Sequence, residues 1–255
     1  MKSWNLREGR KVPLNIAHRG SSVRAPQNTM AAFELALQDG ADGIELDVHL
    51  SSDGVPVVIH NFTVDATTDG TGAVNDLTLA ELKRLDAGSW FAPEFTGQRI
   101  PTLEEVLTTI DSRLLVNVEI KSTRIANTGL EWSVVEVVRR CGPSDRILFS
   151  SFNPIALWRC KQLAPDIAVG LVYAGDLSLP LRRAWLAPLV RPEAHHPHHA
   201  MVDDRYMARA RARGVAVNVW TVDDPDEMQR LIDLGVGGFF TNVPDVLHHI
   251  LQTQD

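Results

Sequence analysis

Short apolar runs alternate with segments of helical periodicity along the chain, and in three places a helix passes into a strand through glycine. These places are LQDGADGIEL, RARGVAVNVW and LIDLGVGGFF. Glycine supplies the left-handed residue that ends a helix before a short loop. Repeated helix–strand units of this kind favour a parallel sheet with right-handed crossovers.

The number of these units indicates how the sheet closes. About eight of them fit a closed barrel better than an open sheet, and AHRGSS after the first strand is not the Gly-rich phosphate loop of a doubly wound fold. We therefore predict an α/β protein with a (β/α)8 TIM barrel, and a weak additional strand near residues 200–202. The main strands are expected at Leu14–His18, Gly43–His49, Val57–His60, Leu115–Lys121, Arg146–Phe149, Ala168–Val172, Val215–Trp220 and Gly238–Thr241.

Several helix starts are readable as well. Thr102 and Glu105 have the spacing of a capping box. Asn153 and Asp224 each precede a proline at the first helical position, and Asp203 opens a segment that stops at glycine.

Two stretches interrupt the regular alternation of predicted strands and helices. Residues 61–101 are longer than a normal loop and predict a small insertion after the third strand, at the barrel end where substrate pockets are built. Residues 174–200 contain a short amphipathic helix and the turn HHPHH. A linker between domains is the alternative for either stretch, but strand-like runs on both sides favour one domain over residues 1–255. For HHPHH we prefer a loop at the pocket rim, with His196 or His198 touching substrate, to a second metal site.

Composition narrows the class of partner. The 255 residues include 25 basic and 32 acidic ones, a net charge of −7, with no Arg/Lys run, so nucleic acid is an unexpected partner. Cys141 and Cys160 suit structural thiols in a reducing compartment, with a disulfide as the alternative. No apolar signal segment and no run of 18 apolar residues occurs, so we expect a soluble cytoplasmic protein without stable membrane insertion. The amphipathic segment LPLRRAWLAPLV leaves a shallow membrane contact as an alternative, and the oligomeric state is not indicated.

The segment IELDVHLSSDGVPVVIHN, residues 44–61, carries charges inside apolar runs. Strand side chains alternate between faces, so Glu45 and Asp47 share the face opposite Ile44, Leu46 and Val48. Two adjacent buried carboxylates are unfavourable unless something neutralises them.

Other polar residues also occur at predicted strand ends. His18 and Arg19 follow the first strand, His60 ends the third, and Glu119 and Lys121 belong to VNVEIKS. Because the carboxyl ends of barrel strands converge on one face, we expect these side chains to meet Glu45 and Asp47 there.

The charges of this constellation predict a metal ion. Three carboxylates and two cations sum to −1, and one divalent cation would bring the site to +1, which attracts a phosphodiester. Carboxylates without thiolates favour Mg²⁺ or Ca²⁺. The alternative is that Arg19 and Lys121 alone neutralise the acids by ion pairing, but then one of the three carboxylates has no cation.

The two histidines suit general acid and base chemistry, because an imidazole titrates near neutrality. Arg19 suits bidentate contact with phosphate oxygens, and Lys121 a point-charge contact. This combination indicates phosphodiester chemistry.

At this level the chain resembles the glycerophosphodiester phosphodiesterase family. Its opening signature is similar to residues 17–61, and the likeness continues through TTDGTGAVNDLTLAEL, IPTLEEVL, VNVEIKS, SSFNP, VNVWTVDD and FFTNVPD, over about residues 14–247. The resemblance implies a (β/α)8 barrel that hydrolyses glycerophosphodiesters to glycerol 3-phosphate and an alcohol. It implies His18 and His60 as the acid/base pair, Arg19 and Lys121 as phosphate contacts, and Glu45, Asp47 and Glu119 as metal ligands.

By the same resemblance Trp220 is a candidate to stack on the glycerol or alcohol moiety, and Phe152 is similar. Plain barrel packing is the alternative for both. Trp90, Phe91 and Phe95 are expected either to line a substrate mouth or to form a small core under the insertion.

Three positions depart from the family pattern. Gln27 stands where Glu is usual, Asn61 where Asp is usual, and Asn242 where Asp is common. Each keeps the size of the side chain and removes a charge. The resulting hypothesis is an enzyme that turns over more slowly or accepts a narrower range of substrates, because Asn61 neighbours the proposed catalytic His60.

Two other functions remain open at this stage. A phospholipase D-like enzyme would release cyclic phosphate from lysophospholipids and would need a wider, apolar pocket mouth. A non-catalytic phosphodiester-binding protein is suggested by the lost acids. The intact set of two histidines and three carboxylates argues against this binding protein.

Overall fold

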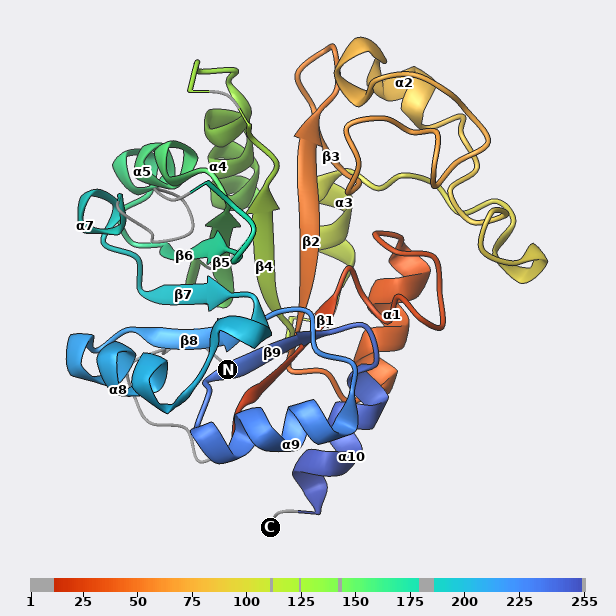
Figure 1. Ribbon diagram of the computed structural model, residues 1–255. Helices are drawn as coiled ribbons and strands as arrows, with labels where there is room; N and C mark the ends of the chain where they lie inside the picture. Colours follow the sequence, from red (N-terminus) through yellow and green to blue (C-terminus); the bar gives the residue numbers. More distant parts are fainter. Residues whose placement is uncertain (1–11, 111, 124, 142–143, 179–185, 254–255) are drawn as a thin grey trace.

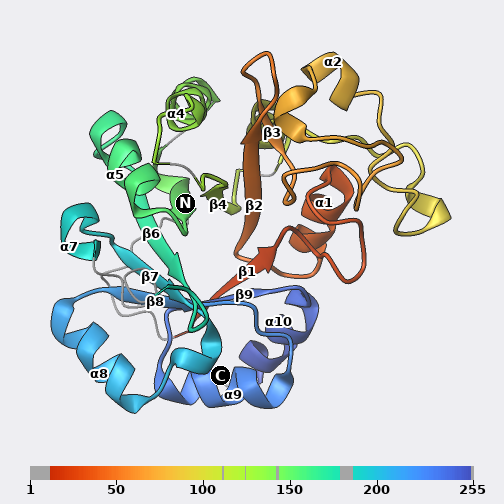
Figure 2. The ribbon, with the colours of Figure 1, turned by 45° about the horizontal axis from the view of Figure 1, so that its top comes forward.

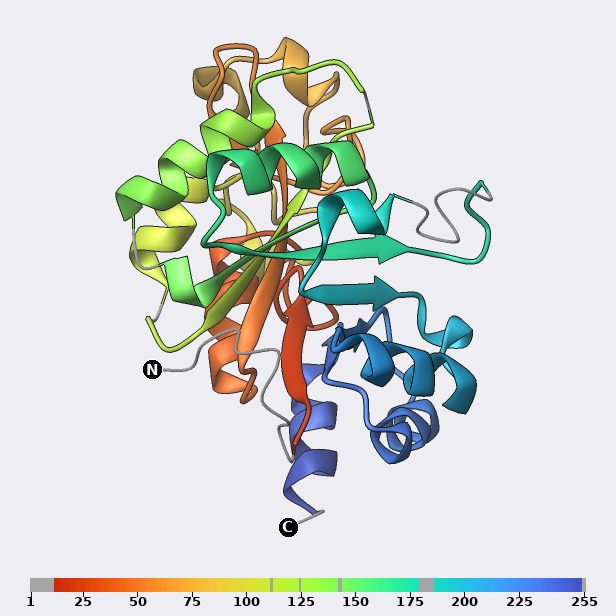
Figure 3. The ribbon, with the colours of Figure 1, turned by 90° about the vertical axis from the view of Figure 1, so that its left-hand side faces the viewer.

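The computed structural model describes residues 12–110, 112–123, 125–141, 144–178 and 186–253. In this part of the chain eight parallel strands follow the spatial order β1-β9-β8-β7-β6-β5-β4-β2, and pairing of β1 with β2 closes the barrel (Figures 1 and 3). The predicted (β/α)8 barrel is therefore confirmed. The barrel strands are β1 (Leu14–His18), β2 (Gly43–Leu50), β4 (Leu115–Ile120), β5 (Ile147–Ser151), β6 (Ala168–Tyr173), β7 (Ala194–Pro197), β8 (Ala216–Val219) and β9 (Gly238–Thr241).

Helices surround the barrel (Figure 2). The predicted capping residues Thr102, Asn153, Asp203 and Asp224 each accept a backbone hydrogen bond at a helix start, and Thr102 forms the complete capping box with Glu105. The helices are α1 (Met30–Gln38), α2 (Leu79–Leu82), α3 (Leu103–Thr109), α4 (Leu130–Cys141), α5 (Pro154–Leu163), α7 (Ala187–Val190), α8 (Asp204–Arg213), α9 (Pro225–Leu234) and α10 (Pro244–Gln252), with short 3-10 turns at Val74–Asp76, Pro93–Phe95, Ser144–Arg146 and His199–Met201.

The third strand in chain order is not a barrel strand. β3 (Pro56–Val58) pairs antiparallel with β2, so the two form a hairpin. Gly54 adopts a φ of +82° in the turn, a conformation that glycine accepts readily. The prediction of a strand over Val57–His60 was therefore right about extended backbone, but His60 lies in the loop after the strand.

The sixth barrel strand, β7, lies earlier in the chain than predicted. Residues 194–197 form β7 between β6 and β8, whereas residues 199–201 form a 3-10 turn. The weak strand near 200–202 was wrong, and so was the loop at HHPHH. AHHP is not an apolar run, and hydrogen bonds to neighbouring strands on both sides, rather than side-chain pattern, place it in the sheet.

The insertion after β3 has a small core of its own. Val57 and Ile59 from the hairpin pack with apolar residues of the insertion, among them Val64, Leu82 and Ile100. The aromatic side chains predicted as either mouth or core stack edge-on in a row, Trp90 against Phe91 and Phe91 against Phe95. Trp90 is exposed and none of the three rings belongs to the buried core of the insertion, so the core alternative is wrong and the substrate mouth stays a prediction.

The main core lies between the barrel and the helices. Ile44, Leu46 and Val48 belong to it, so the opposite face of β2 points into the barrel, as alternation predicts. Apolar side chains fill the barrel interior, among them Leu14, Leu115 and Leu148.

Cys141 and Cys160 are free thiols, as expected for the reduced alternative. Most of the predicted amphipathic segment, residues 179–185, lies outside the described residues. In the described part of the chain, every helix is too short or too polar to cross a bilayer.

Candidate active site

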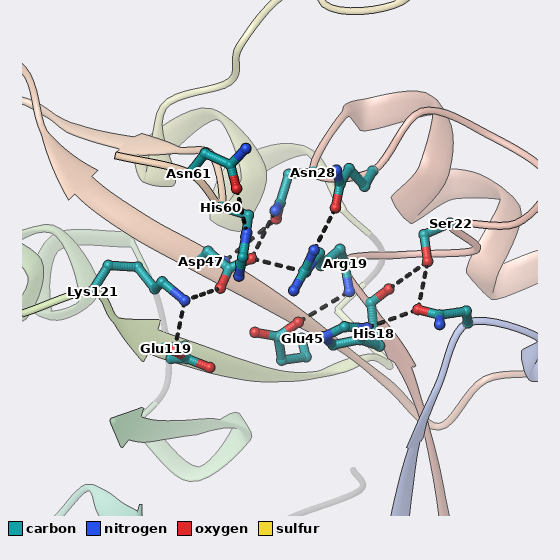
Figure 4. A network of polar contacts seen from close by, with 12 residues as sticks. His18, Arg19, Ser22, Asn28, Glu45, Asp47, His60, Asn61, Glu119 and Lys121 are labelled. Atoms are coloured by element: carbon teal, nitrogen blue, oxygen red, sulfur yellow. Dashed lines mark hydrogen bonds and ion pairs between the residues drawn. The ribbon is translucent and has the colours of Figure 1, made fainter. Parts of the chain in front are cut away.

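The predicted polar residues converge at the carboxyl end of the barrel strands (Figure 4). The strand register makes them neighbours: His18 of β1 lies beside Glu45 of β2, and Asp47 of β2 lies beside Glu119 of β4. The convergence expected for a parallel barrel is therefore present at this end of the sheet.

The turn after β1 aims Arg19 at these acids. Arg19 has a φ of +58°, and Gly20 follows with a φ of +83°. A Cβ atom on Gly20 would lie 2.6 Å from the backbone carbon of Ala32, so only glycine fits there. This turn lets the Arg19 backbone N–H donate to Oε2 of Glu45 at 3.0 Å.

The side chain of Arg19 reaches the second acid of β2. Its Nε lies 3.3 Å from Oδ2 of Asp47, and its Nη1 donates to Oε1 of Gln27 at 2.7 Å. Gln27 thus fixes the guanidinium without adding charge. The departure from Glu at position 27 leaves Arg19 with more net positive charge for an anionic substrate.

Lys121 and Asn28 complete the surroundings of Asp47. The ammonium Nζ of Lys121 lies 3.3 Å from Oδ1 of Asp47 and 3.0 Å from Oε1 of Glu119. Asn28 donates from Nδ2 to Oδ2 of Asp47 at 2.8 Å and accepts from its backbone N–H. Asp47 is therefore held by two cations and an amide.

Two of the three carboxyls lack comparable compensation. Burial would raise the pKa of Asp47, but Lys121 and Arg19 more than offset it and lower that pKa. The pKa of Glu45 is raised well above its usual value by burial and by Asp47. The pKa of Glu119 is also raised, chiefly by burial, with Lys121 opposing. Without a further positive charge, the cluster therefore disfavours ionisation of Glu45 and Glu119.

This cluster fits a divalent cation. One oxygen from each of Glu45, Asp47 and Glu119 lies within 4.8 Å of the others, and Oε1 of Glu45 is buried without a hydrogen-bond partner. Oxygen-only ligands are those of a hard cation. Among the described residues, the histidines of HHPHH belong to no such cluster of metal-ligating side chains.

Both candidate catalytic histidines meet amide oxygens. Nδ1 of His18 lies 2.7 Å from Oδ1 of Asn242, and Nδ1 of His60 lies 2.7 Å from Oδ1 of Asn61. Burial lowers the pKa of His18 to about 4, with Arg19 adding to the effect. Burial also lowers the pKa of His60, and the attraction of Asp47 only partly opposes this.

A third histidine supports this arrangement and was not predicted as a site residue. Nε2 of His49 lies 3.1 Å from the carbonyl oxygen of His60, and its ring packs edge-on against Phe62. The sequence did indicate His49, because strand alternation puts it on the same face as Glu45 and Asp47. Asn28, which directly precedes Thr29 at the start of α1, was not predicted as a site residue either.

The two predicted aromatic contacts, Phe152 and Trp220, pack against each other. Their ring centroids are 5.4 Å apart, and Trp220 also lies 5.3 Å from the ring of His198. Trp220 donates from its indole N–H to the carbonyl oxygen of His196 at 2.8 Å and packs against the barrel interior. The structure thus brings the two predicted aromatics together and holds Trp220 in place.

His196, predicted to touch substrate as one alternative, points inward and is buried. Its Nε2 lies 3.2 Å from Nδ2 of Asn218, and its ring lies 4.9 Å from Phe240. Burial, with a smaller effect from His195, lowers its pKa to about 3. The ring of His196 is therefore part of the barrel interior, whereas the ring of His198 packs against that of Trp220.

The sequence model of the Glycerophosphoryl diester phosphodiesterase family matches residues 18–246. The chain belongs to this family. A glycerophosphodiester phosphodiesterase from Caldanaerobacter subterraneus subsp. tengcongensis is 43% identical over 94% of this chain and 98% of the relative. The resemblance seen in the sequence is confirmed, and with it the prediction of an enzyme, a phosphoric diester hydrolase.

Solved structures of the glycerophosphodiester phosphodiesterase family share the fold. A phosphodiesterase from Oleispira antarctica, solved in complex with its product sn-glycerol-3-phosphate, is 36% identical with a TM-score of 0.85 over 94% of this chain and 97% of its own. A glycerophosphodiester phosphodiesterase from Agrobacterium tumefaciens is 30% identical with a TM-score of 0.79 over 92% and 98%.

Proposed function

We propose that this protein hydrolyses glycerophosphodiesters to glycerol 3-phosphate and an alcohol in a metal-dependent reaction, with His18 and His60 as the acid/base pair. The observation that carries the proposal is the joining of three carboxylates, two cations and two histidines at one end of the barrel. Membership of the family and the glycerol-3-phosphate bound to the Oleispira antarctica relative support the substrate class.

Glu45, Asp47 and Glu119 are the proposed ligands of one divalent cation, Mg²⁺ or Ca²⁺. The unpartnered Oε1 of Glu45 and the raised pKa values of Glu45 and Glu119 support this, because the positive charge around these two carboxyls is too small to offset their burial and the repulsion of Asp47. When bound, the ion would polarise a phosphoryl oxygen and neutralise the acids.

The histidines would move the protons. The Oδ1 atoms of Asn242 and Asn61 accept hydrogen bonds, so Nδ1 of each ring carries hydrogen, and Nε2 is left to exchange a proton with substrate or water. One ring acts as base toward the attacking hydroxyl or water, and the other, protonated, acts as acid toward the leaving alcohol.

Arg19 and Lys121 are the proposed phosphate contacts. Both already border Asp47, so an anion that binds between them would replace part of the ion pairing in the free enzyme. Trp220 and Phe152 are the proposed apolar contacts for glycerol or the alcohol. Their edge-on packing supports the role because it supplies a fixed surface at the same end of the barrel.

The experiment is release of glycerol 3-phosphate from glycerophosphocholine and glycerophosphoethanolamine. The enzyme is first treated with EDTA and then given Mg²⁺, Ca²⁺ or Mn²⁺. We expect no release after EDTA, recovery with at least one ion, and loss of turnover in H18A and H60A with ligand binding retained. Absence of release with every ion would overturn the proposal and direct the assay to lysophospholipids, with cyclic phosphate as the product to detect.

A further inference from the structure

Asp223 stands outside the predicted set of site residues, in the loop between β8 and α9, yet it binds the end of β9. Its Oδ1 accepts from the backbone N–H of Asn242 at 2.8 Å and from Oγ1 of Thr241 at 3.1 Å. Its Oδ2 accepts from the side-chain Nδ2 of Asn242 at 2.7 Å. One exposed carboxylate therefore receives three hydrogen bonds from two consecutive residues.

These contacts fix which way the amide of Asn242 faces. A carboxylate only accepts hydrogen bonds, so the NH2 group of Asn242 must point at Asp223. The amide oxygen then points the other way, 2.7 Å from Nδ1 of His18 and 2.9 Å from Oγ of Ser22, which donates to it. Asp223 thus assigns both ends of the amide, and the contacts with His18 and Ser22 are compatible with that orientation, because an imidazole nitrogen and a hydroxyl can each donate.

The orientation of Asn242 in turn selects a tautomer of His18. Because Oδ1 of Asn242 only accepts, Nδ1 of His18 must carry the hydrogen and Nε2 must carry the lone pair of the neutral ring. A flipped amide would present NH2 to Nδ1 and move the ring hydrogen to Nε2. That ring would have no lone pair at the atom left for proton exchange.

We propose that Asp223 is a positioning residue, which fixes the tautomer of His18 through the side-chain amide of Asn242. The inference rests on the proposed function only for its effect on turnover, since the tautomer itself is a property of the folded chain. It also accounts for asparagine where the family commonly has Asp, because a carboxylate at position 242 would face the carboxylate of Asp223.

The contacts of Asp223 determine what its amide isostere would do. In D223N the oxygen of the new amide stays on the fixed backbone donor of Asn242, and its NH2 group replaces Oδ2. Two NH2 groups would then face each other, so Asn242 flips and presents its own NH2 to His18. The swap D223N/N242D restores the original pattern. The carboxylate introduced at position 242 accepts from the amide introduced at position 223 on one side and from His18 on the other.

The experiment combines turnover with imidazole spectra of this protein labelled with ¹⁵N at histidine. In the wild type we expect a pyrrole-like Nδ1 and a pyridine-like Nε2 for His18, assigned by their loss in H18Q. D223N should exchange the two signals and lower kcat by about 10- to 100-fold with KM within about twofold. N242D should also lower kcat, and the swap should recover most of it. D226N, which changes an exposed acid of the same region, is the matched control and should change neither readout.

Wild-type signals for His18 in D223N would overturn the inference, whatever the activity. A swap no more active than N242D would also overturn it, and this comparison stands if D223N alone does not fold. Full activity of H18Q with the expected exchange of signals would instead reject the proposed role of His18 and leave the tautomer control in place.

Discussion

The ring nitrogen Nδ1 of His60 lies 2.7 Å from the side-chain oxygen of Asn61, the next residue in the chain. An amide oxygen orients the imidazole as a carboxylate oxygen would, but it carries no net charge. The protonated form of His60 therefore gains orientation from Asn61 but no counter-charge, and burial lowers its pKa because the attraction of Asp47 only partly opposes it. The departure from Asp at position 61 thus affects charge and leaves the geometry intact.

Replacement of Asn61 by aspartate should raise kcat. In N61D a carboxylate would accept from the same Nδ1 and stabilise the imidazolium, which raises the pKa of His60 toward neutrality. We expect an increase of about threefold to tenfold in turnover of glycerophosphocholine at neutral pH. N61A, which loses the acceptor, is the control and should be slower than the wild type. Unchanged turnover in N61D, alone and combined with Q27E, would contradict the hypothesis of a slower enzyme.

Replacement of Glu45 by glutamine should separate metal binding from stability. Burial and Asp47 raise the pKa of Glu45, so a neutral side chain at this position relieves repulsion in the metal-free protein. Metal-free E45Q should therefore melt at or above the wild-type temperature, whereas added metal should raise the melting temperature of the wild type alone. Thermal unfolding after EDTA treatment, with and without Mg²⁺ or Ca²⁺, measures both. A retained metal shift in E45Q would reject Glu45 as a ligand, and a less stable metal-free E45Q would contradict the repulsion argument.

Replacement of Lys121 by methionine should have the opposite effect on the metal-free protein. Lys121 pairs with Asp47 and Glu119 and its side chain is only 12% exposed. Its loss leaves Glu119 without its ion-pair partner and Asp47 with Arg19 as its remaining cation, which should lower the free energy of unfolding by about 2 to 4 kcal/mol. Saturating metal should restore much of that stability but not activity, because the proposed phosphate contact is gone. Full activity of metal-saturated K121M would show that the lysine serves the fold alone.

The residues on regular strands were predictable, because alternation alone assigns their faces. Glu45, Asp47 and Glu119 lie in uninterrupted strands of the barrel, and their convergence follows from parallel topology. β7 was missed because AHHP lacks an apolar pattern. The strand at β3 was predicted, but its antiparallel pairing with β2 was missed although SSDGV contains Asp-Gly, a typical hairpin signal.

Contacts between loops distant in sequence had no local signal. Asp223 and Asn242 meet because β8 and β9 are neighbours in the barrel, and Ser22 joins them from the turn after β1. In the sequence Asp223 and Ser22 are ordinary polar loop positions, and Asn242 is noticeable only as a departure from the family pattern, with no indication of its partners. Only the closed barrel brings the three loops together, so their roles could be recognised only in the structure.

His196 should make the protein less stable in acid. Burial lowers its pKa from the ordinary 6.5 to about 3. Between these values the unfolded chain binds a proton at this ring and the folded chain does not, so the free energy of unfolding falls as pH falls through this window, and this effect is absent above it.

Replacement of His196 by glutamine tests this, because glutamine keeps an acceptor for Nδ2 of Asn218 without a titrating ring. Urea unfolding from pH 4 to 7.5 should show the slope of unfolding free energy against pH reduced in H196Q by up to about 1.4 kcal/mol per pH unit. H249Q replaces an exposed histidine and is the matched control for the loss of one imidazole. An H196Q slope equal to that of the wild type would show that acid destabilisation arises at other groups, and that the ring of His196 takes up its proton without unfolding the barrel.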